Sequence, residues 1–232
     1  TITISAIIYD VPGNMTIGSE SNTKLVINQS IPIIINSNIE SDFSDSSLAG
    51  VDNIITLIFE TDTEIIIPSV TISGQEAIIV NLGDNEWQAS YTMQSSDEDG
   101  IIPFVIDFMD VYGNPNSVIN STEDGTSVTF DNSKPSLSFV SIKSSNQDTT
   151  FAKVGDTITI IFEADEVLTS QIASINSKNT EITSINEGLL TKYYAKYVME
   201  NTDNEGEINF EIIVTDSIGI HSNPVTETTN NS

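Results

Sequence analysis

The sequence contains no cysteine, only one histidine and only seven basic residues, all of them lysines. Without cysteine the chain cannot form disulfides or thiolate metal sites, and one histidine cannot supply a Cys–His pair or a His-rich zinc site. No apolar run approaches the roughly 18 residues of a membrane-spanning helix. Strong helix formers are scarce, and no long window has a clean helical period. These absences argue against a helical membrane segment and against several large enzyme classes.

Acidic residues outnumber basic ones by 34 to 7, which gives a formal net charge of −27. A chain of this charge repels the phosphate backbone of nucleic acids and the surface of anionic lipids. It attracts divalent and small cations, either as a diffuse atmosphere or at discrete carboxylate sites. We therefore expect cations as partners and no nucleic acid.

An internal repeat organises the chain. The segment Leu48–Glu60 recurs 103 residues later as Phe151–Glu163, and Tyr91-Thr92-Met93 recurs 106 residues later as Tyr197-Val198-Met199. Self-similarity at a fixed period is the signature of tandem repeats. It predicts three parts: residues 1–31 as the C-terminal strands of a preceding domain, 32–134 as a complete domain, and 135–232 as a domain that lacks its last strand.

Each repeat reads as seven short strands. Hydrophobic residues make up 38% of the chain and are mostly Ile and Val, which favour strands. Apolar and polar residues alternate, and turn signals separate the alternating segments. In the complete repeat the predicted strands are 32–39, 53–60, 66–73, 76–81, 87–93, 101–109 and an interrupted 117–131. Seven alternating strands in about 100 residues predict an all-β fold of tandem immunoglobulin-like β-sandwich domains.

Several segments resemble the Ig-like repeats of large bacterial and archaeal surface proteins. They are AKVGDTITIIFEADE at 152–166, YVMENTDNEGEINFEIIVTD at 197–216 and Asp110-Val111-Tyr112-Gly113-Asn114. In its acidic, lysine-only, Asn-rich composition the chain is similar to S-layer proteins of ammonia-oxidising archaea. It departs from the repeat at Gly219-Ile220, where the pattern would have Asn.

The resemblance implies a secreted structural protein of the cell surface or cell wall. Its sandwiches would self-associate into an S-layer lattice or array whose negative charge holds cations. The stalk of a large repetitive adhesin is the alternative, and a filament built by strand exchange between subunits is a third possibility. No membrane span is expected in this segment, and its localisation is expected to be extracellular.

Acidic residues gather in loops that strand parity brings to the junction between successive repeats. Such carboxylates suit Ca²⁺, which takes about 6–8 hard oxygen ligands and tolerates irregular geometry. Glu166 lies in one of these loops but is not among the predicted ligands. The ligands predicted for a structural Ca²⁺ are Asp97, Asp99, Asp131, Glu163, Asp165, Asp216, Glu60, Asp62 and Asp110. Simple solvation of the loops is the alternative. Asp110 and Asp216 can also cap their own loops as Asx-turns.

Other motifs point to surface chemistry and not to catalysis. Glycosylation sequons begin at Asn14, Asn28, Asn120 and Asn230, so the chain is a candidate glycoprotein. The single histidine, His221, falls in a connecting loop, and there is no nucleophile elbow or phosphate-binding glycine motif. We therefore expect no enzymatic activity.

Overall fold

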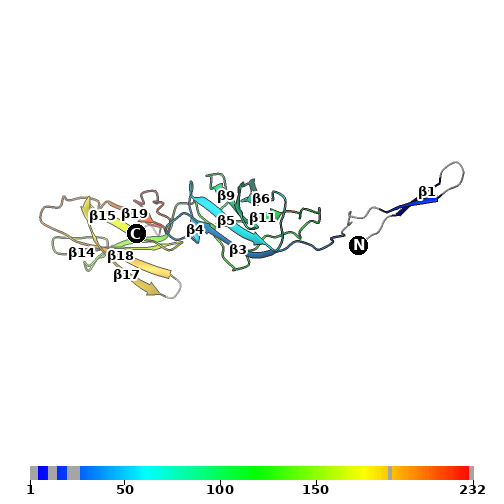
Figure 1. Ribbon diagram of the computed structural model, residues 1–232. Coiled ribbons are helices and arrows are strands. Elements are labelled where there is room, and N and C mark those ends of the chain that lie inside the picture. The colour runs from blue at the N-terminus through cyan, green and yellow to red at the C-terminus, as the bar shows by residue number, and fades with distance from the viewer. Residues whose placement is uncertain (1–4, 10–14, 20–26, 188–189, 230–232) are drawn as a thin grey trace. The chain divides into compact units, whose positions relative to one another are not determined.

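The computed structural model describes residues 5–9, 15–19, 27–187 and 190–229 (Figure 1). All the extended regular structure in these ranges is β-strand, and none of it is a helix that could cross a bilayer. The chain divides into two compact units. The first unit contains 1–40, 55–91 and 103–127, and the second contains 41–54, 92–102 and 128–232. A hairpin of β1 (Ser5–Tyr9) and β2 (Met15–Ser19) belongs to the first unit.

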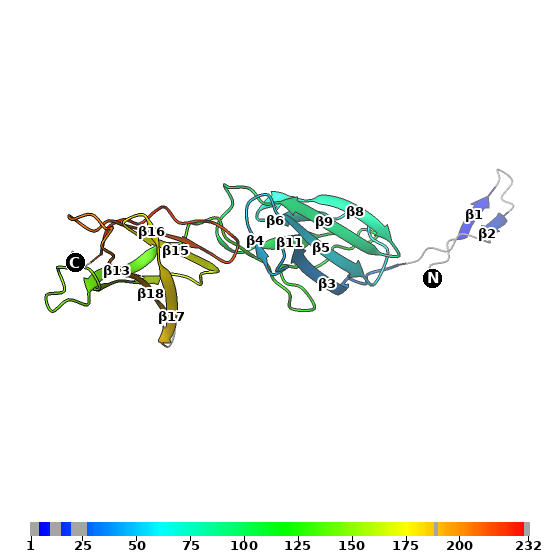
Figure 2. The same ribbon diagram turned by 90° about the vertical axis from the view of Figure 1, so that its left-hand side faces the viewer.

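Two sheets build the sandwich of the first unit (Figure 2). One has the order β3-β5-β9-β8, and the other has the order β11-β6-β7. Their strands are β3 (Ile34–Ser41), β5 (Ile54–Thr61), β6 (Ser69–Ile72), β7 (Gln75–Glu76), β8 (Ile78–Gly83), β9 (Glu86–Thr92) and β11 (Phe104–Asp107). Alternation decides which side chains are buried, because successive residues of a strand point to opposite faces. Ile55, Leu57 and Phe59 of β5 are accordingly buried while their neighbours are not.

The second unit repeats this strand order. One sheet runs β13-β14-β18-β17 and the other runs β16-β15-β19. Their strands are β13 (Leu137–Ser144), β14 (Thr157–Ala164), β15 (Ser170–Ile175), β16 (Lys178–Asn179), β17 (Glu181–Glu187), β18 (Leu190–Val198) and β19 (Phe210–Thr215). A further small sheet joins β4 (Leu48–Ala49), β10 (Gly100–Ile101) and β12 (Thr129–Phe130), with β12 antiparallel to β10 and parallel to β4.

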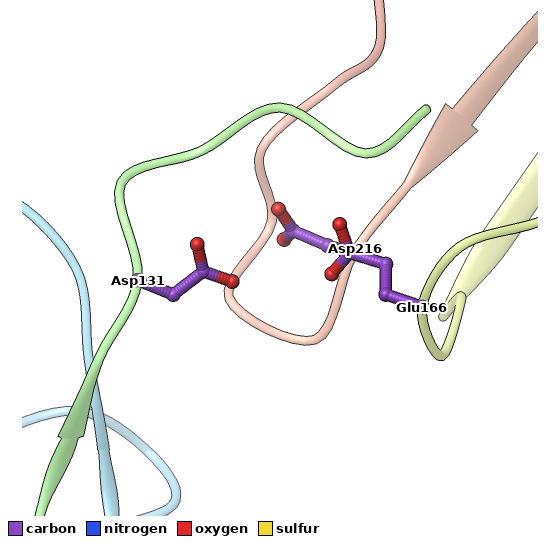
Figure 3. Close-up of side chains that lie close together, drawn as sticks. All are labelled: Asp131, Glu166 and Asp216. Atoms are coloured by element: carbon purple, nitrogen blue, oxygen red, sulfur yellow. The ribbon is translucent and has the colours of Figure 1, made fainter. Parts of the chain in front are cut away.

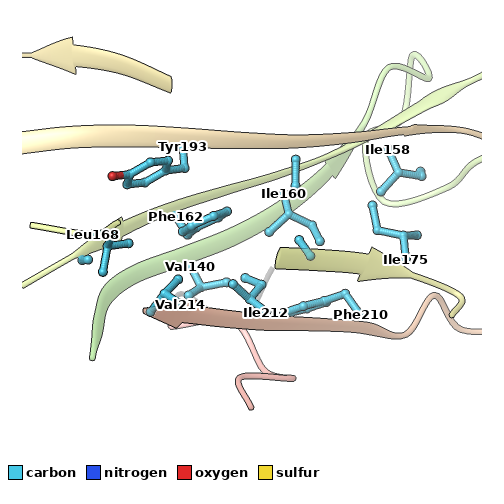
Figure 4. Close-up of a cluster of buried hydrophobic side chains, with 13 residues drawn as sticks. Val140, Ile158, Ile160, Phe162, Leu168, Ile175, Tyr193, Phe210, Ile212 and Val214 are labelled. Carbon is cyan, nitrogen blue, oxygen red and sulfur yellow. The ribbon is translucent and has the colours of Figure 1, made fainter. Parts of the chain in front are cut away.

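The core of the second unit lies between its two sheets (Figure 4). Ile158, Ile160 and Phe162 of β14 face Ala173 and Ile175 of β15 across this core. The ring of Phe162 stacks on Tyr193, with centroids 5.1 Å apart and planes 15° apart. Trp87 of β9 and Tyr193 of β18 pack into the cores of their units, since they are only 5% and 8% exposed.

These sheets are those of an immunoglobulin-like sandwich, with four strands opposite three. The predicted seventh strand, 117–131, is wrong for most of its length. Only Thr129–Phe130 is a strand, and a single bridge joins Ile119 to Ile106. Polar side chains explain the interruption, because hydroxyl and carboxylate groups there bond to nearby backbone. Thr122 donates to the carbonyl of Thr126, for example.

Candidate cation-binding site

Three carboxylates converge in the second unit (Figure 3). Asp131 directly follows β12, Glu166 lies two residues beyond β14, and Asp216 directly follows β19. One oxygen from each side chain can be chosen so that all three lie within 4.8 Å of one another. Each acid occupies the loop at the end of a strand, so the sandwich framework fixes where its backbone lies.

Asp216 is the most constrained of the three residues. Its side chain is fully buried, and its Oδ1 accepts hydrogen bonds from the amides of Ile218 (3.0 Å) and Ile220 (2.8 Å). The predicted Asx-turn role is therefore confirmed for Asp216. Its Oδ2, however, is buried and has no hydrogen-bond partner among the described residues. An unsatisfied buried acceptor is costly, and a charged one is more so.

The other two carboxylates leave oxygen atoms available beside Asp216. The Oδ1 of Asp131 accepts bonds from the amide (3.0 Å) and hydroxyl (2.9 Å) of Ser133, and its Oδ2 accepts no hydrogen bond from the described residues. Glu166 is half-buried. Burial, and after it the charges of Asp131, Asp216 and Asp165, raise the pKa of Glu166 above its ordinary value. Three mutually repelling carboxylates that form no ion pair with the described residues create a strong local negative field.

No lysine neutralises this cluster. The ion pairs in the described ranges involve Lys153, Lys178 and Lys192, and none includes Asp131, Glu166 or Asp216. The carboxylate oxygens of the cluster that accept no hydrogen bond are hard oxygen ligands, the kind that Ca²⁺ prefers. The cluster therefore has the chemistry of a cation site and lacks the histidine or nucleophile that acid–base or covalent catalysis most often uses.

The other predicted ligands lie outside the cluster and make local contacts. Glu163 forms an ion pair with Lys192 at 3.1 Å. Four more accept backbone amides: Asp62 from Ile33, Asp97 from Gln94, Asp99 from Asn132 and Asp165 from Ser136. Glu60 lies half-buried on β5. Of the predicted ligands, the structure thus brings together only Asp131 and Asp216.

Glu166 completes the cluster. The sequence led us to expect Glu166 in one of the acidic loops, but it was not among the predicted ligands. Its neighbour Asp165 is held by the amide and hydroxyl of Ser136. Burial raises the pKa of Asp165, but these bonds outweigh it, so that the pKa lies below its ordinary value. The repeat did contain a signal for Glu166. Asp62 and Asp165 accept matching backbone amides, so the residues that directly follow them occupy matching positions in the two repeats.

The remaining predicted sites fall on the surface or outside the described residues. Asn120 is exposed and Asn28 is half-buried, while Asn14 and Asn230 lie outside the described ranges. His221 is exposed, and its Nδ1 lies 2.9 Å from the hydroxyl of Thr215.

No family model matches the chain, and no curated protein matches it in sequence. Solved structures that are similar include the fibronectin(III)-like modules of CbhA from Clostridium thermocellum, with 14% identity, 82% of this chain and 91% of that chain covered, and a TM-score of 0.31. Rst D1-D2 is 11% identical over 83% of this chain and 98% of that one, with a TM-score of 0.35. A chicken TCR is 12% identical over 82% and 97%, with a TM-score of 0.30. These similarities are too weak to support a functional argument. The assignment of the fold rests on the sheets described above.

Proposed function

We propose that this chain is a structural, non-catalytic segment of a cell-surface protein and that it forms part of an acidic S-layer lattice. The observation that supports this best is that one sandwich topology occurs twice in the chain, in the same strand order. Repeated domains of the same topology are suited to building extended assemblies. The net charge of −27 would give such a lattice a strong affinity for divalent and small cations.

Exposed apolar side chains on an edge strand favour self-association over an isolated stalk. Ile78 and Val80 lie on β8 at alternate positions and are 71% and 44% exposed. Residues at alternate positions of a strand share one face of the sheet. Because β8 is the last strand of its sheet, it also has unpaired backbone groups along its outer edge. The stalk of a repetitive adhesin is the second candidate, since tandem sandwiches alone suit it equally well.

Immunogold labelling of intact cells that produce the protein tests this proposal. A lattice predicts dense, regularly spaced label over the whole cell surface, and electron microscopy should show sheets that disperse when divalent cations are removed. Isolated rods with sparse label would favour the adhesin stalk. Label that appears only after the cells are lysed would refute both candidates.

A further inference from the structure

The unpartnered Oδ2 of Asp216 has a counterpart in the first unit, and that counterpart is satisfied. Asp110 lies three residues beyond β11, and Asp216 directly follows β19, the matching strand of the second unit. Its Oδ1 accepts the amides of Tyr112 (2.9 Å) and Asn114 (2.8 Å), the same two-and-four spacing seen at Asp216. The Oδ2 of Asp110, however, accepts a bond from the side-chain Nδ2 of Asn114 at 2.9 Å. Ile220 stands in the place of Asn114 in the second unit and has no side-chain donor.

The other two acids of the cluster also replace neutral residues of the first unit. Asp131 corresponds to Asn28, because the Oδ1 of each accepts the amide two residues further on at 3.0 Å. Glu166 corresponds to Thr63, because the residue before each is an aspartate that accepts a matched amide at 3.0 Å. At these matching positions the first unit therefore has one carboxylate and one side-chain amide that donates to it. In the described part of the second unit the same positions have three carboxylates and no such donor.

We propose that Asp131, Glu166 and Asp216 bind one Ca²⁺ in the second unit, and that Asn114 takes the place of the ion in the first. Ca²⁺–oxygen distances are about 2.3–2.6 Å, so ligands on opposite sides of one ion are about 4.6–5.2 Å apart. Carboxylate oxygens that all lie within 4.8 Å of one another fit around such an ion. The ion would supply the missing partner of the Asp216 Oδ2 and neutralise the repulsion among the three acids.

Ca²⁺ is favoured over Mg²⁺ by the same geometry. Mg²⁺ demands near-ideal octahedral ligands at about 2.0–2.1 Å and gives up its water reluctantly. Carboxylates that arrive from three separate loops suit the larger and less demanding ion. A proton shared between Glu166 and Asp216 is the rival explanation of the buried oxygen, and it requires no metal.

Calorimetric titration of the full, chelator-stripped chain with CaCl₂ tests the site at pH 7.5, in about 0.15 M NaCl to screen diffuse binding. We expect one saturable site that takes Mg²⁺ at least about tenfold more weakly. A hundredfold excess of Ca²⁺ over Kd should raise the melting temperature of the second unit by about 5–10 °C. An unchanged melting temperature, or Ca²⁺ binding no stronger than Mg²⁺ binding, would refute the proposal.

Variants taken from the first unit make the test specific. Glu166→Thr should raise the melting temperature without Ca²⁺, because one repelling charge is gone, and should abolish the Ca²⁺-dependent increase. Ile220→Asn should weaken Ca²⁺ binding by offering an amide to Asp216. Thr63→Glu is the matched control, and it should create no new site because Asn114 already satisfies Asp110.

A Glu166→Thr variant with the parent's Ca²⁺ response would overturn the assignment. A parent that ignores Ca²⁺ and becomes less stable as the pH is raised from acidic to neutral would support the shared proton instead. The site does not depend on the lattice, since Ca²⁺ can bind to a stalk protein as well. Its failure in calorimetry and the failure of surface labelling are therefore separate outcomes.

Discussion

Replacing Phe162 by alanine removes a ring that is fully buried between the two sheets of the second unit and stacked on Tyr193. A buried aromatic side chain covers about 150–250 Å² of surface. Losing roughly 150 Å² of apolar burial costs about 3.8 kcal/mol at about 25 cal/mol per Å². The lost stacking adds about 0.5–1.5 kcal/mol. We therefore expect a cost of about 4–5 kcal/mol, at the upper end of what truncated core aromatics show.

The assay is urea and thermal unfolding of the full chain followed by circular dichroism. The single tryptophan, Trp87, lies in the first unit, so its fluorescence should show that unit unfolding as it does in the parent. A cost of about 4 kcal/mol should lower the melting temperature of the second unit by about 8–16 °C. Phe151 provides a matched control in the same unit, because it is 69% exposed. Phe151→Ala should change the free energy of unfolding by less than about 0.5 kcal/mol. Equal effects of the two substitutions would refute the packing described for this core.

Three further substitutions test polar contacts. Asp156→Asn should lower stability at neutral pH. The bonds from Lys153 and then Asn146 lower the pKa of Asp156 from 3.8 to about 2, so its stabilisation is present above pH 4 and lost as the pH falls toward 2. The variant should therefore lose less stability than the parent between pH 4 and 2, and an identical pH profile would contradict this. Asn114→Ile should lower the melting temperature by several degrees, because it leaves the buried Oδ2 of Asp110 unpaired as in the second unit; no change in melting would refute the comparison. Lys178→Met should destabilise the chain at pH 7, and this loss should shrink only below the ordinary titration range of an aspartate, because the bond from Lys178 lowers the pKa of its 2.8 Å partner Asp203; an effect independent of pH would argue against this ion pair.

Hydrophobic alternation was sufficient to predict the main strands. Ile55, Leu57 and Phe59 alternate with polar or half-exposed neighbours, and β5 lies close to the predicted range 53–60. Short elements escaped prediction. The strand Leu48–Ala49 is too brief to show a period, and its pairing depends on a distant parallel partner at Thr129–Phe130.

The candidate site was predictable only in part. Strand parity placed Asp131 and Asp216 near one another, because it brings both loops to the junction between successive repeats. The choice of Glu166 over Asp165 depends on which side chain the amide of Ser136 holds, and no periodic pattern encodes that contact. The departure at Ile220 was visible in the sequence. Its meaning required the structure, which shows that Asn114 bonds to Asp110 and that Asp216 has no such partner.

The parallel pairing of β12 with β4 has a mechanical consequence. The bonds from the amides of Thr129 to Ser47 and of Asp131 to Ala49 lie across the direction in which the chain runs. Tension along β12 therefore loads these bonds together, in shear, and does not peel them apart one at a time. Resistance to pulling is governed by the rate of unfolding and not by equilibrium stability. A two-residue strand can in this way resist force along the chain. Asp131, which directly follows this strand, is one of the three ligands of the proposed ion.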